Sequence, residues 1–290
     1  MEIQWYPGHM TKTKRLIEEN IKLVDVIIEL LDARAPKSTK NPDIDKFAKN
    51  KPKILMLNKS DLANPQITKE WINFYENENT KVVPVISTSG KGIKNVVDIA
   101  QDLLKEKIER DLKRGRIYRP IRAMVVGIPN VGKSTFINTL VGKGATKTGD
   151  KPGVTKGKQW IKLKKGVELL DMPGILWPKF DDQEVAKKLA YLGSINDSIL
   201  NIQELAIDFI GLARERFSNT FFTRYAIRDY ETLNDHEILL EIGKLRGVLS
   251  QKGKIDEVRT SKIIIDDFRH HRMGDVSLEK PVLESKVYVK

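Results

Sequence analysis

The strongest constraint on the fold is a glycine-rich segment that lies between an apolar run and a helical pattern. Residues 127–134 read Gly-Ile-Pro-Asn-Val-Gly-Lys-Ser and match G-x-x-x-x-G-K-[ST]. The glycines let the backbone wrap closely, so that successive N–H groups point at phosphate oxygens. The start of the following helix adds positive potential. We therefore expect a phosphate-binding loop at the end of a buried strand.

Three side chains of this loop have distinct expected roles. Lys133 would reach the β- and γ-phosphates and assist catalysis, and the Ser134 hydroxyl would bind Mg²⁺. The amide oxygen of Asn130 can ligate a monovalent cation beside the phosphates, but the same side chain can also cap its own backbone. The expected nucleotide-binding residues of the loop are Asn130, Val131, Gly132, Lys133, Ser134 and Thr135.

A second motif, N-K-x-D, indicates which base is bound. Residues 58–61 follow an apolar run and end in Asp61. Its carboxylate can accept hydrogen bonds from both the ring N–H and the exocyclic amine of guanine, whereas adenine would leave it unpaired. The Ser-Thr-Ser loop at residues 87–89 is expected to lie behind the base, although a simple strand-end turn explains it equally well. The expected base-binding residues are Asn58, Lys59, Ser60, Asp61, Ser87 and Thr88.

A third motif, D-x-x-G, occupies residues 171–174. Asp171 would hold Mg²⁺ through water, and the Gly174 N–H would bind the γ-phosphate. Thr155 lies between the phosphate loop and this motif, so we expect it to be the switch threonine, a Mg²⁺ ligand and part of the catalytic apparatus. Ile175 stands where many switch GTPases have a water-orienting glutamine. An aliphatic side chain cannot orient water, so hydrolysis needs another group.

His9 is one candidate for that group. It lies in a turn-prone segment before the first helical pattern, and imidazole exchanges protons near neutral pH. From the residues alone, a surface histidine in a loop is the simpler interpretation. The remaining histidines, His236, His270 and His271, lack metal-ligand spacing and are expected on the surface.

The order of the motifs is unusual, because N-K-x-D precedes the phosphate loop. Apolar runs that alternate with helical patterns predict a parallel sheet covered by helices, with each motif at the end of a strand. The ends of such a domain lie close together, so a permuted chain can form the same sheet. We expect an α/β P-loop NTPase G domain, circularly permuted, over residues 1–178. A small all-helical domain is expected over residues 179–290.

The expected elements follow the hydrophobic pattern. The expected strands cover residues 24–31, 53–57, 82–86, 121–126, 159–163 and 167–170. The expected helices cover residues 10–23, 65–79, a segment ending near 113, a segment starting near 133, and residues 184–192, 202–216, 236–245 and 257–269.

The net charge of +12 is unevenly distributed. Up to Gly174 there are 33 Lys and Arg against 20 Asp and Glu, and beyond it 18 against 19. Two stretches, residues 105–122 and 143–168, carry much of the excess. A basic domain suggests a polyanionic partner such as nucleic acid, and a merely lysine-rich surface is the alternative. With no cysteine, no signal peptide and no bilayer-length apolar stretch, we expect a soluble, cytoplasmic protein without membrane contact.

Taken together, these segments resemble the ribosome biogenesis GTPase A family of permuted bacterial GTPases. The resemblance rests on the motif order, residues 3–10 (Ile-Gln-Trp-Tyr-Pro-Gly-His-Met), residues 32–34 (Asp-Ala-Arg), the phosphate loop, and residues 173–178 (Pro-Gly-Ile-Leu-Trp-Pro). It covers nearly the whole chain and is vaguer after about residue 230. It implies GTP as substrate, Mg²⁺, and action late in assembly of the large ribosomal subunit, whose precursor particle stimulates hydrolysis. We also expect a monomer.

The resemblance also implies roles for individual residues. His9 matches the histidine regarded as catalytic in the family, and Asn130 matches the asparagine associated with potassium dependence. The helical domain is implied to touch ribosomal RNA. The charge distribution instead places rRNA contacts on the two basic stretches, where binding would weaken steeply with salt. Met172 departs from the threonine that relatives often carry, and we expect little effect from this.

Two other functions remain to be weighed against this one. An RNA-binding module with a structural nucleotide would bind GTP without turning it over. An ATP-using phosphoryl-transfer enzyme is disfavoured by Asp61, and no acceptor-pocket signature is visible. Turnover and nucleotide competition separate the three.

Overall fold

The computed structural model describes residues 2–4, 8–115, 119–142, 160–177, 180–251 and 253–282. Its centre is a six-stranded sheet in the order β3-β2-β1-β4-β6-β5. The strands are β1 (Val26–Asp32), β2 (Lys53–Asn58), β3 (Thr80–Pro84), β4 (Ile121–Gly127), β5 (Trp160–Leu163) and β6 (Val167–Asp171). All neighbouring pairs are parallel except β5–β6. This is the expected α/β P-loop architecture.

The edge strand β5 differs from the parallel sheet that the sequence predicts. It runs antiparallel to β6, with Trp160 opposite Leu170. The connection between the two strands is a short turn in which Lys165 and Gly166 both have positive φ. So short a connection can only reverse the chain, because a parallel pair needs a crossover of a dozen residues or more.

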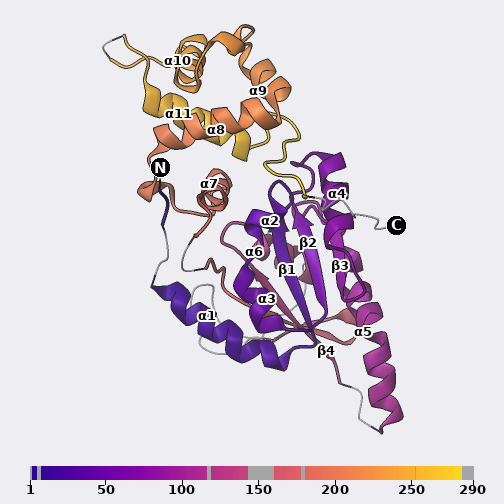
Figure 1. Ribbon diagram of the computed structural model, residues 1–290. Helices are drawn as coiled ribbons and strands as arrows, with labels where there is room; N and C mark the ends of the chain where they lie inside the picture. Colours follow the sequence, from indigo (N-terminus) through magenta and orange to yellow (C-terminus); the bar gives the residue numbers. More distant parts are fainter. Residues whose placement is uncertain are drawn as a thin grey trace, which may run out of the picture.

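Helices cover both faces of the sheet (Figure 1). The helices that precede β5 along the chain are α1 (His9–Asn20), α2 (Pro36–Thr39), α3 (Pro42–Ala48), α4 (Pro65–Tyr75), α5 (Val96–Lys113) and α6 (Lys133–Val141). Side chains of β1 alternate between the faces: Ile28 packs in one core cluster, and Ile27 and Leu31 in two others. The strands are therefore buried on both sides, as their continuous apolar runs predict.

The C-terminal region is helical. Its helices are α7 (Gln183–Tyr191), α8 (Ile202–Arg216), α9 (Ser218–Tyr225), α10 (Asp235–Leu245) and α11 (Glu257–Arg269). In Figure 1, α8–α11 form a bundle above the sheet, and α7 lies between the two. Core residues of α7 and α8, such as Leu189 and Phe209, belong to the same apolar cluster as Ile28. The expected boundary at residues 178–179 lies outside the described residues and stays a prediction.

After α11 the chain returns to the sheet and its covering helices as a strap, residues 276–279. The Val276 N–H donates to the Leu62 carbonyl at 3.1 Å, and the Leu278 N–H donates to the Arg34 carbonyl at 2.8 Å. The buried Glu279 carboxylate accepts from the Ser38 N–H and hydroxyl at 2.9 and 2.6 Å. Its carbonyl accepts from the Trp71 indole at 3.3 Å. The strap therefore ties the helical region to α2 and α4.

Most expected elements are confirmed, and α8 and α11 match their expected ranges. The short helices α2, α3 and α9 were not predicted, because four to eight residues offer too little of an amphipathic repeat to recognise. Helix α4 ends at Tyr75 rather than near residue 79, since the chain there turns into a bridge between Asn77 and Thr80.

Candidate functional site

The motifs meet at the carboxyl ends of β2, β3, β4 and β6, and Asn58 joins three of them. This side chain, 1% exposed, is the last residue of β2. Its amide nitrogen donates to the Val131 carbonyl of the phosphate loop at 2.8 Å. Its amide oxygen accepts from the Ser87 N–H at 3.1 Å and the Ser87 hydroxyl at 2.8 Å. Both ends of the amide are satisfied, so Asn58 fixes the base loops against the phosphate loop.

Lys59 continues this connection. Its φ of 57° places the backbone in the left-handed region, and its ammonium donates to the Asn130 carbonyl at 3.0 Å. The same ammonium lies 3.1 Å from Asp32 Oδ2 at the end of β1. Lys59 thus bridges the phosphate loop and a neighbouring strand.

The phosphate loop has the backbone that its glycines predict. Gly132 has φ +97°, and a Cβ there would lie 2.4 Å from Asn58 Nδ2. Asn130 is also left-handed, with φ 60°, and its amide nitrogen donates to the Gly193 carbonyl after α7 at 2.7 Å. The side chain therefore contacts the helical region rather than its own backbone. Helix α6 begins at Lys133, with Ser134 and Thr135 exposed in its first turn.

The D-x-x-G motif lies directly against this loop. The Lys133 ammonium forms an ion pair with Asp171 at the end of β6. A Cβ on Gly174 would lie 3.2 Å from the backbone of Pro129, so the two segments are in close contact. The Ile175 N–H donates to the Gly127 carbonyl at 3.2 Å, and its side chain is 1% exposed. The Ile175 side chain is therefore packed in the core and offers no polar group to the phosphate loop.

The other base residues are less constrained. The Ser60 hydroxyl donates to the Val85 carbonyl at 3.1 Å, whereas Asp61 and Thr88 are exposed to solvent. The carboxylate expected to read guanine is therefore accessible beside a loop that is anchored at Ser60.

Two expected catalytic residues, His9 and Thr155, lie outside the phosphate loop. Helix α1 begins at His9, one residue earlier than the sequence predicts. Nothing is described of the His9 side chain, and Thr155 lies outside the described residues. Their roles stay predictions. His236, His270 and His271 each lie beside a carboxylate on the surface, as expected.

Two buried acidic residues of β1 were not predicted as part of the site. Asp32 forms a two-point ion pair with Arg34: Nε to Oδ1 at 2.9 Å and Nη2 to Oδ2 at 2.8 Å. Burial alone would raise the pKa of Asp32, but the nearby Arg34 and Lys59 outweigh it and hold the pKa well below its usual range. The position of Asp32 at the end of an apolar run was the available signal.

Glu29 is the second of these residues. Burial raises the pKa of Glu29 to about 7, although nearby Lys40 opposes the shift. Its Oε1 accepts from the Asn41 N–H at 3.1 Å, while Oε2 has no partner among the described residues. The Asn41 amide nitrogen then donates to the Ile175 carbonyl at 3.3 Å. Glu29 is thus connected to the residue that follows D-x-x-G.

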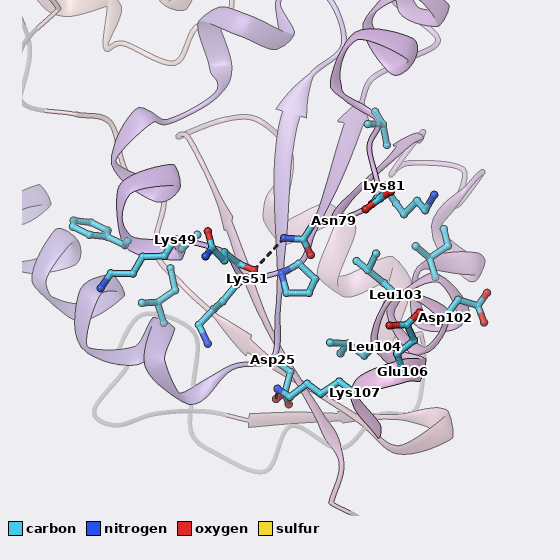
Figure 2. Close-up of a pocket in the computed structure, with 18 of the residues that line it drawn as sticks. Asp25, Lys49, Lys51, Asn79, Lys81, Asp102, Leu103, Leu104, Glu106 and Lys107 are labelled. Atoms are coloured by element: carbon cyan, nitrogen blue, oxygen red, sulfur yellow. Dashed lines mark hydrogen bonds and ion pairs between the residues drawn. The ribbon is translucent and has the colours of Figure 1, made fainter. Parts of the chain in front are cut away.

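A hollow of about 1780 Å³ lies at the opposite end of the sheet (Figure 2). It is bordered by Asp25, Lys51 and Asn79, which lie one or two residues before the starts of β1, β2 and β3. None of the motif residues lines it. Ligands of open α/β sheets bind beyond the carboxyl ends of the strands, so we place the nucleotide site at the motif end and not in this hollow.

Two features are absent from the described ranges. No helix there is long and apolar enough to span a bilayer. Within the same residues, no group of three or more His, Cys, Asp or Glu side chains is arranged to hold a metal ion by itself.

Comparison with known proteins places this geometry in a family. Residues 122–237 match the family described as 50S ribosome-binding GTPase. The chain is 44% identical to ribosome biogenesis GTPase A of Bacillus pumilus, covering 97% of this chain and 99% of the relative. It is 34% identical to the protein of that name in Thermotoga maritima, with 96% and 95% covered.

Solved structures agree. A GDP-bound YlqF superposes with a TM-score of 0.66 at 28% identity, covering 92% of this chain and 99% of the other. The GNP-bound YlqF from T. maritima gives 0.65 at 29% identity, with 93% and 98% covered. The extent of these matches shows a P-loop GTPase, an enzyme that binds and hydrolyses GTP. The chain belongs to the ribosome biogenesis GTPase A family.

Proposed function

We propose that this GTPase acts late in assembly of the large ribosomal subunit and that the precursor particle stimulates its hydrolysis of GTP to GDP and phosphate. The observation that carries the proposal is the convergence of three motifs: Asn58 and Lys59 link N-K-x-D to the phosphate loop, and Lys133 of that loop pairs with Asp171 of D-x-x-G. The names of the relatives and of the matching family supply the ribosomal context.

In this proposal the phosphate loop holds the nucleotide through its backbone. The N–H groups from Asn130 to Thr135 surround the phosphates, and the Lys133 ammonium moves from Asp171 to the β- and γ-phosphates. At the other end of the nucleotide, Asp61 accepts two hydrogen bonds from guanine, with the loop of Ser87 and Thr88 behind the base.

Mg²⁺ fits the donor set on this edge of the sheet. The Ser134 hydroxyl is exposed in the first turn of α6, and Asp171 is 43% exposed at the end of β6. Oxygen ligands of this kind, completed by phosphates and water, suit Mg²⁺. When bound, the ion would neutralise charge on the β- and γ-phosphate oxygens. Thr155 is proposed as a further ligand, and the Gly174 N–H as the γ-phosphate contact.

Asn130 is proposed as a K⁺ ligand through one defined atom. Its nitrogen faces a carbonyl oxygen, that of Gly193, which fixes the orientation of the amide. The remaining atom, Oδ1, is the one available to a cation beside the phosphates. His9 is proposed to orient the attacking water, because Ile175 is apolar and packed in the core.

Contact with rRNA is proposed for the two basic stretches. Within the first stretch, Lys107 and Arg119 pair with Asp25, so their charge is partly neutralised within the chain. Exposed cations at the end of α5, and those on β5 and the turn after it, are better placed to meet phosphates. They are Lys105, Arg110, Lys113, Arg114, Lys162 and Lys164, whereas Lys165 pairs with Asp98. Subunit binding that survives charge reversal at Lys156, Lys158 and Lys162 would contradict this contact.

The deciding test is GTP turnover with and without large-subunit precursor particles, in potassium and in sodium buffer. For the wild type we expect stimulation by the particle that is stronger in potassium. His9→Ala should lose the stimulation while still binding GTP. Absence of stimulation in every condition would refute the ribosomal role. Asp61→Asn is the specificity control: it should favour xanthosine over guanosine nucleotides, because xanthine offers an acceptor where guanine has its exocyclic amine.

A further inference from the structure

The Asp-Ala-Arg segment at the end of β1 has no assigned role, yet it contacts both the base motif and the helical region. We propose that Asp32 is a positioning residue for nucleotide binding: it holds Lys59 in place, and Arg34 makes this hold depend on the docking of α11. The inference rests on the proposed function in one respect, since it assumes that Lys59 contributes to holding the nucleotide.

The first step of the argument is the geometry of Lys59. A lysine side chain is a flexible stem that carries a point charge, so its position is set by what its ammonium binds. Here the ammonium is held from two sides, by Asp32 Oδ2 at 3.1 Å and by the Asn130 carbonyl at 3.0 Å. The backbone of Lys59 is left-handed, which reduces its freedom further. Asp32 supplies the only charged contact of the two.

The second step is that Asp32 itself is shielded from solvent. Its side chain is 2% exposed. Its carboxylate accepts hydrogen bonds from the Arg34 guanidinium and the Arg34 N–H, and it also pairs with the Lys59 ammonium. A carboxylate enclosed in this way acts on the nucleotide through Lys59. This is why we assign it a positioning role rather than a catalytic one.

The third step is that Arg34 is held by the helical region. Its Nη1 donates to the Phe268 carbonyl at 3.4 Å, and its guanidinium carbon lies 4.8 Å from the centroid of the Phe268 ring. Its own carbonyl accepts from the Leu278 N–H of the strap at 2.8 Å. A shift of α11 would therefore move the ion pair that orients Lys59.

The neighbouring residue of α11, Arg269, contacts the segment at the end of α7, and that segment in turn contacts the phosphate loop. Arg269 donates to the carbonyls of Ala190 and Tyr191 at the end of α7, and its guanidinium lies where a Cβ on Gly193 would meet it at 3.3 Å. The Gly193 carbonyl is the acceptor for Asn130. The last two residues of α11 thus support both partners of the Lys59 ammonium, Asp32 and the loop of Asn130.

The test is a double-mutant cycle on the affinity for a fluorescent GDP analogue, using the full chain. We expect Asp32→Asn to weaken binding about tenfold, equivalent to about 1.4 kcal/mol. In a Lys59→Met background the same change should have almost no further effect, because its target is gone. The positioning role would be overturned if the losses of GDP affinity from the two single changes multiplied in the double variant. It would also be overturned if Lys59→Met alone left the affinity unchanged.

A matched control lies at the other end of the same strand. Asp25 immediately precedes β1, is buried, and also pairs with two cations, Lys107 and Arg119. Asp25→Asn should lower stability in the same way while leaving GDP affinity unchanged. Equal effects of the two substitutions on affinity would show a general response to a lost buried carboxylate and would overturn the proposal.

Asp32→Asn leaves the Arg34 charge buried and can prevent folding, so a second variant is needed. Asp32→Asn/Arg34→Met replaces the pair by neutral groups and removes the same contact to Lys59. Phe268→Leu removes the ring over Arg34 but keeps the carbonyl. We expect it to weaken GDP binding about threefold, roughly 0.6 kcal/mol, and only when Lys59 is present. A wild type that fails to bind GDP would instead count against the proposed function.

Discussion

The buried Glu29 carboxyl gives a pH-dependent stability that Glu29→Gln should remove. The pKa of Glu29 is raised to about 7 from the ordinary value of 4.5, and its Oε2 has no partner among the described residues. Below pH 7, the folded protein therefore holds the Glu29 carboxyl in its neutral, protonated form. The stabilising contribution is complete below pH 4.5 and is lost as the pH rises through 7.

The magnitude follows from the two pKa values. One pKa unit corresponds to about 1.4 kcal/mol, so ionisation costs about 3 kcal/mol once the pH exceeds 7. Glutamine has nearly the same shape and stays neutral, and its oxygen can still accept from the Asn41 N–H. We expect Glu29→Gln to stabilise the protein by about 2–3 kcal/mol at pH 8.5 and to change little at pH 5.

Urea unfolding of both proteins at several pH values measures this difference, with nucleotide left out so that binding does not contribute. The exposed Glu76 offers a matched control, since Glu76→Gln should shift stability equally and slightly at every pH. A Glu29→Gln variant that is less stable than wild type at pH 8.5 would refute the reasoning, because it would mean that the carboxylate is paired in the folded state.

Three further predictions concern the contacts between segments. Asn58→Ala removes three buried hydrogen bonds and should lower the free energy of unfolding by about 3 kcal/mol in urea titrations; a loss under 1 kcal/mol would contradict the linking role of Asn58. Gly193→Ala places a Cβ 3.3 Å from the Arg269 guanidinium on a backbone with φ +72° and should lower the free energy of unfolding by about 1–2 kcal/mol; Gly115→Ala has the same φ but nothing near its Cβ and should cost less, and equal costs for the two variants would contradict the contact with Arg269. Glu279→Gln should speed amide hydrogen exchange at the strap, and unchanged exchange at Ser38 would argue against it.

The sequence predicted the sheet and the motifs well because both depend on local chemistry. Apolar runs located each strand to within a few residues, and the spacing of glycines predicted the loop in which Gly132 takes up its positive φ. The antiparallel direction of β5 was missed because direction is set by the length of the following turn, which hydrophobicity does not report. The strap was missed for a different reason: residues 276–279 gain their order from Leu62, Arg34 and Ser38, more than two hundred positions away.

The same limit applies within the site. Asp61 and Lys133 could be assigned roles from motif chemistry alone, but the partners of Asn130 and Asp32 could not. The contact between Asn130 and Gly193 joins residues 63 positions apart, and no local pattern distinguishes it from a capping interaction. Residues whose function depends on a partner from another element are visible only once the chain is folded.

The strap changes what kind of motion the helical region can make. A domain joined to another by one linker can swing open in any direction about that linker. Here the bundle is fastened at two points, by the chain entering α7 and by the strap at residues 276–279, whose Leu278 N–H donates to the carbonyl of the same Arg34 that contacts Phe268. Two fixed points leave a rigid body only one easy movement, a rotation about the line that joins them. Such a rotation would change the contacts of Phe268 and Arg269, at the end of α11, with Arg34 and with the end of α7, while the two attachments stay in place.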